Sequence, residues 1–191
     1  MKYLVHLKPE EHLAQAIFDY RSRISQYITN VSANILHLTI MVLQAESEKE
    51  AAIIGSLESI TTDKLQIEPD QLDLFDESTL VLKIKPKPPL MTFHNNVIES
   101  LRSHINWDET PHFEGDENRK TLYKRYASSY VKEFYRPHIS IAQVNPDLLQ
   151  DKEFNPQLFS GQINDITQFY LSKREPDGWK TIKSFSITQN P

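Results

Sequence analysis

Two stretches of the sequence repeat one order of residue types, in which a histidine and a hydroxyl residue alternate with two apolar residues. The first is His37-Leu38-Thr39-Ile40 and the second is His138-Ile139-Ser140-Ile141. Side chains of a β-strand alternate between its two faces, so each histidine would share a face with its hydroxyl neighbour while the apolar residues face the core. Our working hypothesis is that the two imidazole–hydroxyl pairs converge on one phosphate group.

Two other interpretations of these stretches compete with the hypothesis. The pattern could be accidental, in which case at least one of His37 and His138 would be a buried core residue with a hydrogen-bond partner. A metal site is the second alternative, but the companions Thr39 and Ser140 are neutral hydroxyl residues rather than carboxylates or thiolates. The chain also has no cysteine and no His-Glu-x-x-His motif. We therefore predict a site without a metal ion.

The elements predicted around the two stretches combine helices with short strands. Apolar residues at spacings of three and four predict helices, and alternating or short apolar runs predict strands. We expect a capping box of Ser47 and Glu50 at the start of one helix, and an acidic connection at residues 69–76. The order of elements favours an α+β fold over a doubly wound parallel sheet. Strands are predicted at residues 2–7, 37–43, 64–68, 79–85, around 138, 162–172 and 179–188, and helices at 9–28, 47–60 and 90–105.

The composition is that of a single globular domain covering residues 1–191. Apolar residues make up 39% and charged residues 25% of the chain, which is enough for one sizeable core shared by two lobes. A stiff, proline-rich segment at residues 85–89 is the best candidate for a linker between the lobes. The formal net charge of −5 excludes a long nucleic acid held by overall charge alone, so any polyanion must bind a local patch.

The sequence predicts a cytoplasmic protein that acts as a monomer. The apolar run at residues 1–7 is too short for the core of a signal peptide. No apolar stretch of the sequence reaches the length needed to span a membrane. The absence of cysteine excludes a disulfide framework and is compatible with a reducing compartment.

With its two histidine stretches, the sequence resembles the 2H phosphoesterase superfamily, which includes 2′-5′ RNA ligase-like proteins and 2′,3′-cyclic phosphodiesterases. The signature of that superfamily is a pair of His-x-Thr/Ser tetrads about a hundred residues apart, and here His37 and His138 are 101 positions apart. Residues 34–36 before the first tetrad, the aromatic residues before Pro137 and the segment 179–187 also resemble the family. The resemblance therefore covers nearly the whole chain.

The sequence departs from the family pattern in two places. Ser140 stands where threonine is commoner, although a serine hydroxyl makes the same hydrogen bond. The connection at residues 106–132 is long, and this difference concerns the substrate contacts rather than the chemistry.

The resemblance implies a bilobal, pseudo-symmetric α+β fold, made mainly of antiparallel sheets with flanking helices and a central groove. It also implies cleavage of a phosphodiester without metal or cofactor, often the opening of a 2′,3′-cyclic phosphate to a 2′-phosphate. Family usage assigns His37 as proton donor to the 3′ oxygen and His138 as proton acceptor from water. Thr39 and Ser140 would donate hydrogen bonds to the non-bridging phosphate oxygens. The residues alone leave the roles of the two histidines interchangeable.

The substrate contacts predicted from the sequence lie next to the second tetrad. Tyr135 and Arg136 precede Pro137 and could stack on a base or reach a phosphate. Residues 119–136 hold six Lys or Arg residues against one acid, interleaved with tyrosines, as in sites that hold single-stranded nucleic acid. A solvated amphipathic helix with tyrosines packed on the core explains the same pattern equally well. We expect surface or structural roles for the remaining histidines, which are His6, His12, His94, His104 and His112.

The leading interpretation is a cyclic or 2′-5′ phosphodiesterase that acts on RNA ends or small nucleotides. A 3′-end RNA exonuclease and a 2′-5′ oligoadenylate phosphodiesterase are alternatives that differ in the length and basicity of the groove. A non-catalytic nucleotide-binding module is an alternative from another class. The intact pair of His37 and His138 argues against it, because binding alone does not need two imidazoles.

Overall fold

The computed structural model describes residues 1–31, 35–62, 64–108, 115–126, 128 and 130–187 of the chain. Its strands are β1 (Lys2–Leu7), β2 (Ile28–Asn30), β3 (Leu38–Gln44), β4 (Leu65–Ile67), β5 (Pro69–Phe75), β6 (Thr79–Ile84), β7 (His138–Val144), β8 (Asn164–Ile166), β9 (Gln168–Glu175) and β10 (Gly178–Ser186). Its α-helices are α1 (Glu11–Arg23), α2 (Glu50–Glu58), α3 (Pro88–Leu101) and α4 (Glu117–Tyr126). Short 3-10 helices are η1 (Ser25–Tyr27), η2 (Ser47–Lys49), η3 (Arg102–His104), η4 (Lys132–Phe134) and η5 (Pro146–Gln150).

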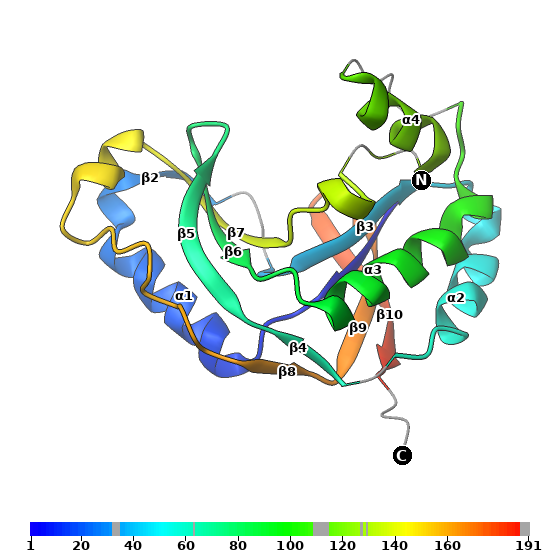
Figure 1. Cartoon of the computed structure of the whole chain (residues 1–191), viewed down its shortest axis with the longest axis horizontal. Helices are drawn as coiled ribbons and strands as arrows, with labels where there is room; N and C mark the ends of the chain where they lie inside the picture. The colour runs from blue at the N-terminus through cyan, green and yellow to red at the C-terminus, as the bar shows by residue number, and fades with distance from the viewer. Residues whose placement is uncertain (32–34, 63, 109–114, 127, 129, 188–191) are drawn as a thin grey trace.

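One antiparallel sheet runs through the molecule in the order β10-β9-β1-β3-β7-β6-β5, with β2 paired to β7. Strands β4 and β8 form a separate two-stranded sheet. The two ends of the large sheet are joined through β3 and β7, which pair at Leu38 and Ile139. Figure 1 shows α1 beside the β5–β6–β7 end of the sheet and α2 and α3 beside the other end. Helices on an antiparallel sheet confirm the predicted α+β class.

The fold contains two strand–helix–strand units, β1-α1-β3 and β6-α3-β7. Within each unit the two strands pair antiparallel to one another. The helices, however, cross over: α1 packs against β7 of the second unit, and α3 packs against β3 of the first. Each tetrad strand is therefore supported by the helix of the other unit.

The helices form because their apolar residues recur on one face. In α1 the buried residues are Leu13, Ile17 and Tyr20, at spacings of four and three. At the other end of the sheet, an aromatic cluster joins α3 to the last two strands. Phe93 meets Phe169 edge-on with ring centroids 5.1 Å apart, and Phe169 stacks on Phe185 at 4.6 Å.

The prediction of a connection at residues 69–76 is wrong, because β5 occupies nearly all of it. Proline and aspartate are rare in strands, which favoured a connection in the sequence. In the structure β5 is an edge strand that pairs with β6, Pro69 opens it, and Leu72 is its anchor in the core. A proline is tolerated at the start of an edge strand, and the intervening polar residues face away from the core.

Two details at helix ends also differ from the prediction. The capping box of Ser47 and Glu50 does not form, since the Ser47 hydroxyl donates to the Glu48 carboxylate and the residues from Ser47 to Lys49 form η2 before α2 begins. The helix expected to reach residue 28 ends at Arg23 and is followed by η1 and β2. Within the described parts of the chain, no helix is long and apolar enough to cross a membrane.

The pairing of β3 with β7, which joins the two ends of the sheet, predicts that one core substitution will lower stability strongly. Ile139 is fully buried and pairs with both Leu38 and Leu82. We expect Ile139→Ala to lower the free energy of unfolding by about 2–5 kcal/mol, because it leaves a cavity that the sheet cannot close. Urea unfolding followed by circular dichroism measures this. Ile163→Ala is the control, since Ile163 is 54% exposed and its truncation should change stability by less than about 0.5 kcal/mol.

Candidate active site

The pairing of β3 with β7 brings the two histidine stretches together. Leu38 and Ile139 lie opposite each other and are fully buried, so they fix which face of each strand points into the core. In an antiparallel ladder the neighbours of such a pair also face one another, which places His37 near Ser140 and Thr39 near His138. All four of these side chains are partly exposed on the other face of the sheet.

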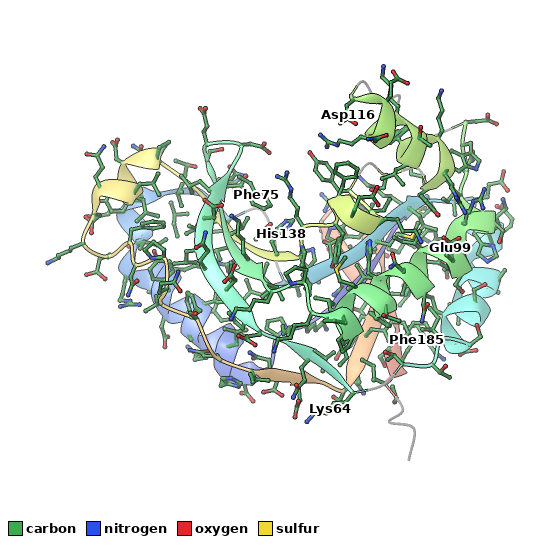
Figure 2. All side chains as sticks on the ribbon, viewed as in Figure 1. Lys64, Phe75, Glu99, Asp116, His138 and Phe185 are labelled. Carbon is green, nitrogen blue, oxygen red and sulfur yellow. The ribbon has the colours of Figure 1, made fainter. Side chains whose placement is uncertain are left out.

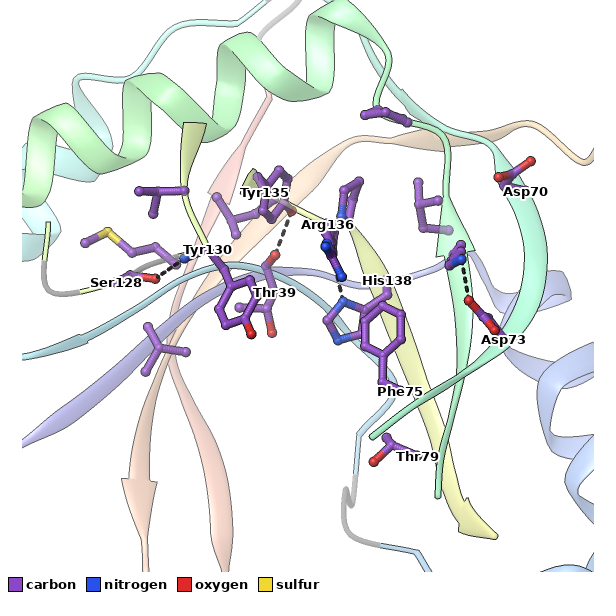
Figure 3. A pocket seen from close by; sticks show the side chains of 18 of the residues that line it. Thr39, Asp70, Asp73, Phe75, Thr79, Ser128, Tyr130, Tyr135, Arg136 and His138 are labelled. Carbon is purple, nitrogen blue, oxygen red and sulfur yellow. Dashed lines mark hydrogen bonds and ion pairs between the residues drawn. The ribbon is translucent and has the colours of Figure 1, made fainter. Parts of the chain in front are cut away.

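The two imidazoles are held in the same way. Nδ1 of His37 is 3.0 Å from the carbonyl oxygen of Ile35, and Nδ1 of His138 is 2.8 Å from the carbonyl oxygen of Arg136. A carbonyl oxygen only accepts hydrogen bonds, so Nδ1 carries the hydrogen in both rings. Nε2 of each histidine is then the nitrogen that remains for proton transfer. Figure 3 marks the bond at His138.

The electrostatics of the pair disfavour two protonated rings. Burial lowers the pKa of His37, the hydrogen bond to Ile35 opposes this effect, and a positive charge on His138 lowers the pKa further. A ring that loses its proton more readily when its neighbour is charged suits a pair in which one imidazole acts as acid and the other as base.

A third histidine, His6 on β1, contacts the site from within the sheet. Its ring is fully buried and lies edge-on to the ring of His37, with centroids 5.5 Å apart. Nε2 of His6 is 2.9 Å from the hydroxyl of Ser172 on β9. Burial, followed by the charges of His37 and Lys8, lowers the pKa of His6 to about 3. His6 is therefore an uncharged support for the ring of His37, in line with the structural role expected for it.

A cavity of about 830 Å³ opens beside the second histidine. Four of the six predicted site residues line it, namely Thr39, Tyr135, Arg136 and His138. Phe75 of β5 forms part of the wall and meets the His138 ring at 4.8 Å between centroids. Figure 3 shows Phe75 and His138 side by side, with Thr39 across from them, and Figure 2 places Phe75 and His138 in the middle of the molecule.

Tyr135 and Arg136 occupy different environments in the cavity wall. The Tyr135 ring stacks on His94 of α3 at 3.7 Å and 8°, and its hydroxyl donates to the carbonyl oxygen of Thr39 at 2.7 Å. One face of the ring and the hydroxyl are thus already engaged, and burial raises the pKa of Tyr135. Arg136 is exposed and lines the cavity. Contact of either residue with substrate stays a prediction.

Carboxylates line the side of the cavity formed by β5 and the turn after it. Asp70, Asp73 and Asp76 belong to the wall, and Asp73 forms an ion pair with Lys83. Metal ions prefer clusters of such ligands, but no group of three or more His, Cys, Asp or Glu residues within the described ranges is close enough to hold one.

A model of the 2′-5′ RNA ligase superfamily matches residues 9–168. The chain belongs to this superfamily. Membership supports a phosphodiesterase-type activity, because the superfamily comprises 2H phosphoesterases. No curated protein sequence matches the chain.

Solved structures with the same fold cover the whole molecule. TT0787 of Thermus thermophilus shares 13% identity with this superfamily member, with a TM-score of 0.70 and full coverage of both chains. E. coli LigT complexed with 3′-AMP shares 16% identity and has a TM-score of 0.65, with 98% of each chain covered. LigT complexed with ATP shares 17% identity at a TM-score of 0.64, again with 98% of each chain covered. The likeness confirms the fold.

Three residues near the candidate site were not predicted from the sequence. Phe75 lay in a segment interpreted as a connection, and His6 and His94 were assigned surface or structural roles. Both histidines are fully buried, which removes the surface alternative for them. His6 stands in an otherwise apolar buried run, residues 3–7, and that run is the signal that could have selected it. His94 is not in such a run but shares the buried face of α3 with Phe93 and Val97, and its position on that face is the signal there. His112 lies outside the described residues.

The low pKa of His6 predicts acid sensitivity. The unfolded chain takes up a proton near pH 6.5 and the folded chain only near pH 3, so His6 makes the folded state progressively less stable as pH falls through that window. Its share of the loss between pH 7 and pH 5 is about 2 kcal/mol. In His6→Leu, the loss of unfolding free energy between pH 7 and pH 5 should therefore be smaller by about 2 kcal/mol. Urea unfolding at several pH values measures this loss.

The matched control for this experiment is His12→Leu, which removes an exposed histidine at the start of α1. A loss that was reduced equally in both variants would contradict the assignment. Part of the loss remains in His6→Leu, because burial also lowers the pKa of His94 to about 4.

Proposed function

We propose that the protein is a metal-independent phosphodiesterase that opens 2′,3′-cyclic phosphates at RNA ends or on nucleotides, or cleaves 2′-5′ linkages. The convergence of two imidazoles with matched Nδ1 hydrogen bonds supports this best, because it leaves two Nε2 atoms on one face of the sheet. A nucleotide-binding module has no need of such a pair. The chain is proposed to act as a cytoplasmic monomer.

In the proposed reaction, neutral His138 accepts a proton from water through Nε2 as the water oxygen attacks phosphorus. The bond between phosphorus and the 3′ oxygen breaks, and protonated His37 donates its Nε2 proton to that oxygen. The product is a 2′-phosphate with a free 3′ hydroxyl. His138 has gained one proton and His37 has lost one, so exchange with solvent restores both. Hydroxyls of Thr39 and Ser140 donate to the non-bridging oxygens, where charge develops.

The cavity suits a nucleotide bound with its phosphate toward His138, the histidine of the pair that lines it. Arg136 is an exposed cation of the wall next to His138 and is proposed to contact the substrate, with Tyr135 beside it. LigT, which has the same fold, has been solved with 3′-AMP, ATP and NADP+. The carboxylates along β5 would repel a phosphate but accept hydrogen bonds from sugar hydroxyls or base amino groups.

RNA as substrate is favoured by the helix at the rim of the cavity. Arg119 of α4 lies over the ring of Tyr130, a lining residue, at 4.5 Å. Lys124 and Arg125 add two more cations in the last turn of the helix. A strand longer than one nucleotide would pass this basic helix, which keeps a 3′-end exonuclease and a 2′-5′ oligoadenylate phosphodiesterase as alternative proposals.

The proposal predicts that both histidines are essential for turnover. Hydrolysis of 2′,3′-cyclic AMP and of 2′-5′-linked oligonucleotides should proceed with EDTA present. We expect His37→Ala and His138→Ala each to lower kcat by about 10²–10⁴-fold, the usual contribution of a positioned acid or base. Chromatography of the nucleotide products measures this. A wild type that turned over neither substrate, or lost activity in EDTA, would overturn the proposal.

Substitutions of Arg136 and Arg125 test whether the site binds only a mononucleotide or also a longer RNA. Loss of a charged hydrogen-bond donor to the substrate costs about 1.5–3 kcal/mol, so Arg136→Gln should raise KM for both substrate types by about tenfold or more. Arg125→Gln should raise KM only for oligonucleotides, if RNA passes along α4. Steady-state kinetics on a cyclic mononucleotide and on an RNA with a cyclic end distinguish the two. An equal KM for RNA in wild type and Arg125→Gln would contradict the RNA path.

A further inference from the structure

Both tetrad strands carry a β-bulge directly after the hydroxyl residue. Between β1 and β3, Val5 pairs with Met41 but His6 pairs with Thr39, so Ile40 is an extra residue. Between β6 and β7, Leu80 pairs with Ala142 but Val81 pairs with Ser140, which makes Ile141 the extra residue there.

The burial pattern of the two strands shows the same extra residue in each. Alternation is regular through Ile40 in β3 and through Ile141 in β7, and the next residues, Met41 and Ala142, are buried as well. Such bulges recur next to active sites, where they redirect a side chain. A bulged residue also lacks its partner in the ladder, so its backbone groups need hydrogen bonds from elsewhere.

Each bulge receives that hydrogen bond from a helix. Nδ1 of His94 on α3 is 2.9 Å from the carbonyl oxygen of Ile40 and, because a carbonyl only accepts, donates to it. Nε of Arg21 on α1 donates to the carbonyl oxygen of Ile141 at 2.8 Å. His94 is fully buried and Arg21 half-buried. The two donors are different residue types on different helices, but each donates to the carbonyl oxygen of the extra residue of a bulge.

We propose that His94 and Arg21 are positioning residues, each of which holds the carbonyl of one bulge and thereby fixes the catalytic hydroxyl before it. His94 acts on Thr39 through Ile40, and Arg21 acts on Ser140 through Ile141. Since the helices cross over, each unit of the fold positions the hydroxyl of the other. A reacting group displaced by about 1 Å loses about a hundredfold in rate, so such restraint matters for turnover.

The test replaces each donor with a side chain of similar shape. His94→Phe keeps an aromatic ring on Tyr135 and removes the donor, while His94→Asn places an amide nitrogen close to the position of Nδ1. Arg21→Met removes the donor, while Arg21→Gln keeps an N–H at the position of Nε. We expect the donor-free variants to lower kcat by about 10–100-fold with little change in KM, and the donor-retaining variants to stay within about threefold of wild type.

Double substitutions show through which hydroxyl each donor acts. In a Thr39→Val background His94→Phe should have almost no further effect, whereas in Ser140→Ala it should keep its full effect. Arg21→Met should show the opposite dependence. Equal losses in all backgrounds, or equal losses in His94→Asn and His94→Phe, would overturn the proposal.

Matched controls come from the same regions of the chain. His104→Phe removes a histidine whose Nε2 hydrogen-bonds the Ser56 hydroxyl, away from both bulges, and should keep wild-type kcat. Arg23→Met removes the neighbouring arginine of α1 and should do the same. If a donor-free variant failed to fold, as judged by thermal melting, the donor-retaining partner would decide, since a loss of kcat there also contradicts the proposal.

The kinetic experiments rest on the proposed function. A second measurement, by NMR, does not depend on activity. Backbone amide chemical shifts at residues 39–41 should move in His94→Phe and those at 140–142 should not, with the converse in Arg21→Met. A wild type inactive on every substrate would overturn the proposed function alone. Shifts that moved equally at both bulges, or at neither, would overturn the positioning role alone.

Discussion

The pairing of Leu38 with Ile139 is the contact on which the rest of the structure depends. It joins the two ends of the sheet and brings together histidines that are 101 positions apart in the chain. Because both residues are fully buried, the imidazoles and hydroxyls on either side of them must face away from the core. A slip of one residue in this register would turn every one of those side chains inward. Core packing and the geometry of the candidate site are therefore set by the same contact.

The crossed helices follow from that arrangement and explain why the site belongs to both units. Helix α1 covers β7 and α3 covers β3, so neither strand–helix–strand unit can bury its own tetrad strand alone. Tyr135 adds a further link, because it precedes β7 in the chain while its hydroxyl holds the carbonyl oxygen of Thr39 on β3. Crossed helices of this kind tie the two units more closely than a linker alone would. The proposed site, which would need four side chains at fixed distances, would gain from such a connection.

Local patterns in the sequence predicted most elements and the two strands that carry the histidine tetrads, because alternation and helical spacing depend on near neighbours in the chain. The bulges at Ile40 and Ile141 could not be predicted from the sequence, because an extra residue is defined only by the register of the partner strand. Strand β5 was missed because its Pro69 and carboxylates are suited to an edge strand, a position that only the sheet order reveals. The burial of His94 likewise depends on α3 packing across onto the other unit.

Charge around the cavity constrains how the proposed substrate lies. Of the two cations among its described lining residues, Lys83 is paired with Asp73, while Arg136 is exposed next to His138. The lining residues of β5 and the turn after it also include Asp70 and Asp76. In the proposed complex, Arg136 would stabilise a phosphate and the carboxylates of β5 would repel it, so the sugar and base of a nucleotide would lie nearer those carboxylates than its phosphate. A polyanion lying along the whole cavity would meet those carboxylates, so a longer RNA has to leave on the side of α4.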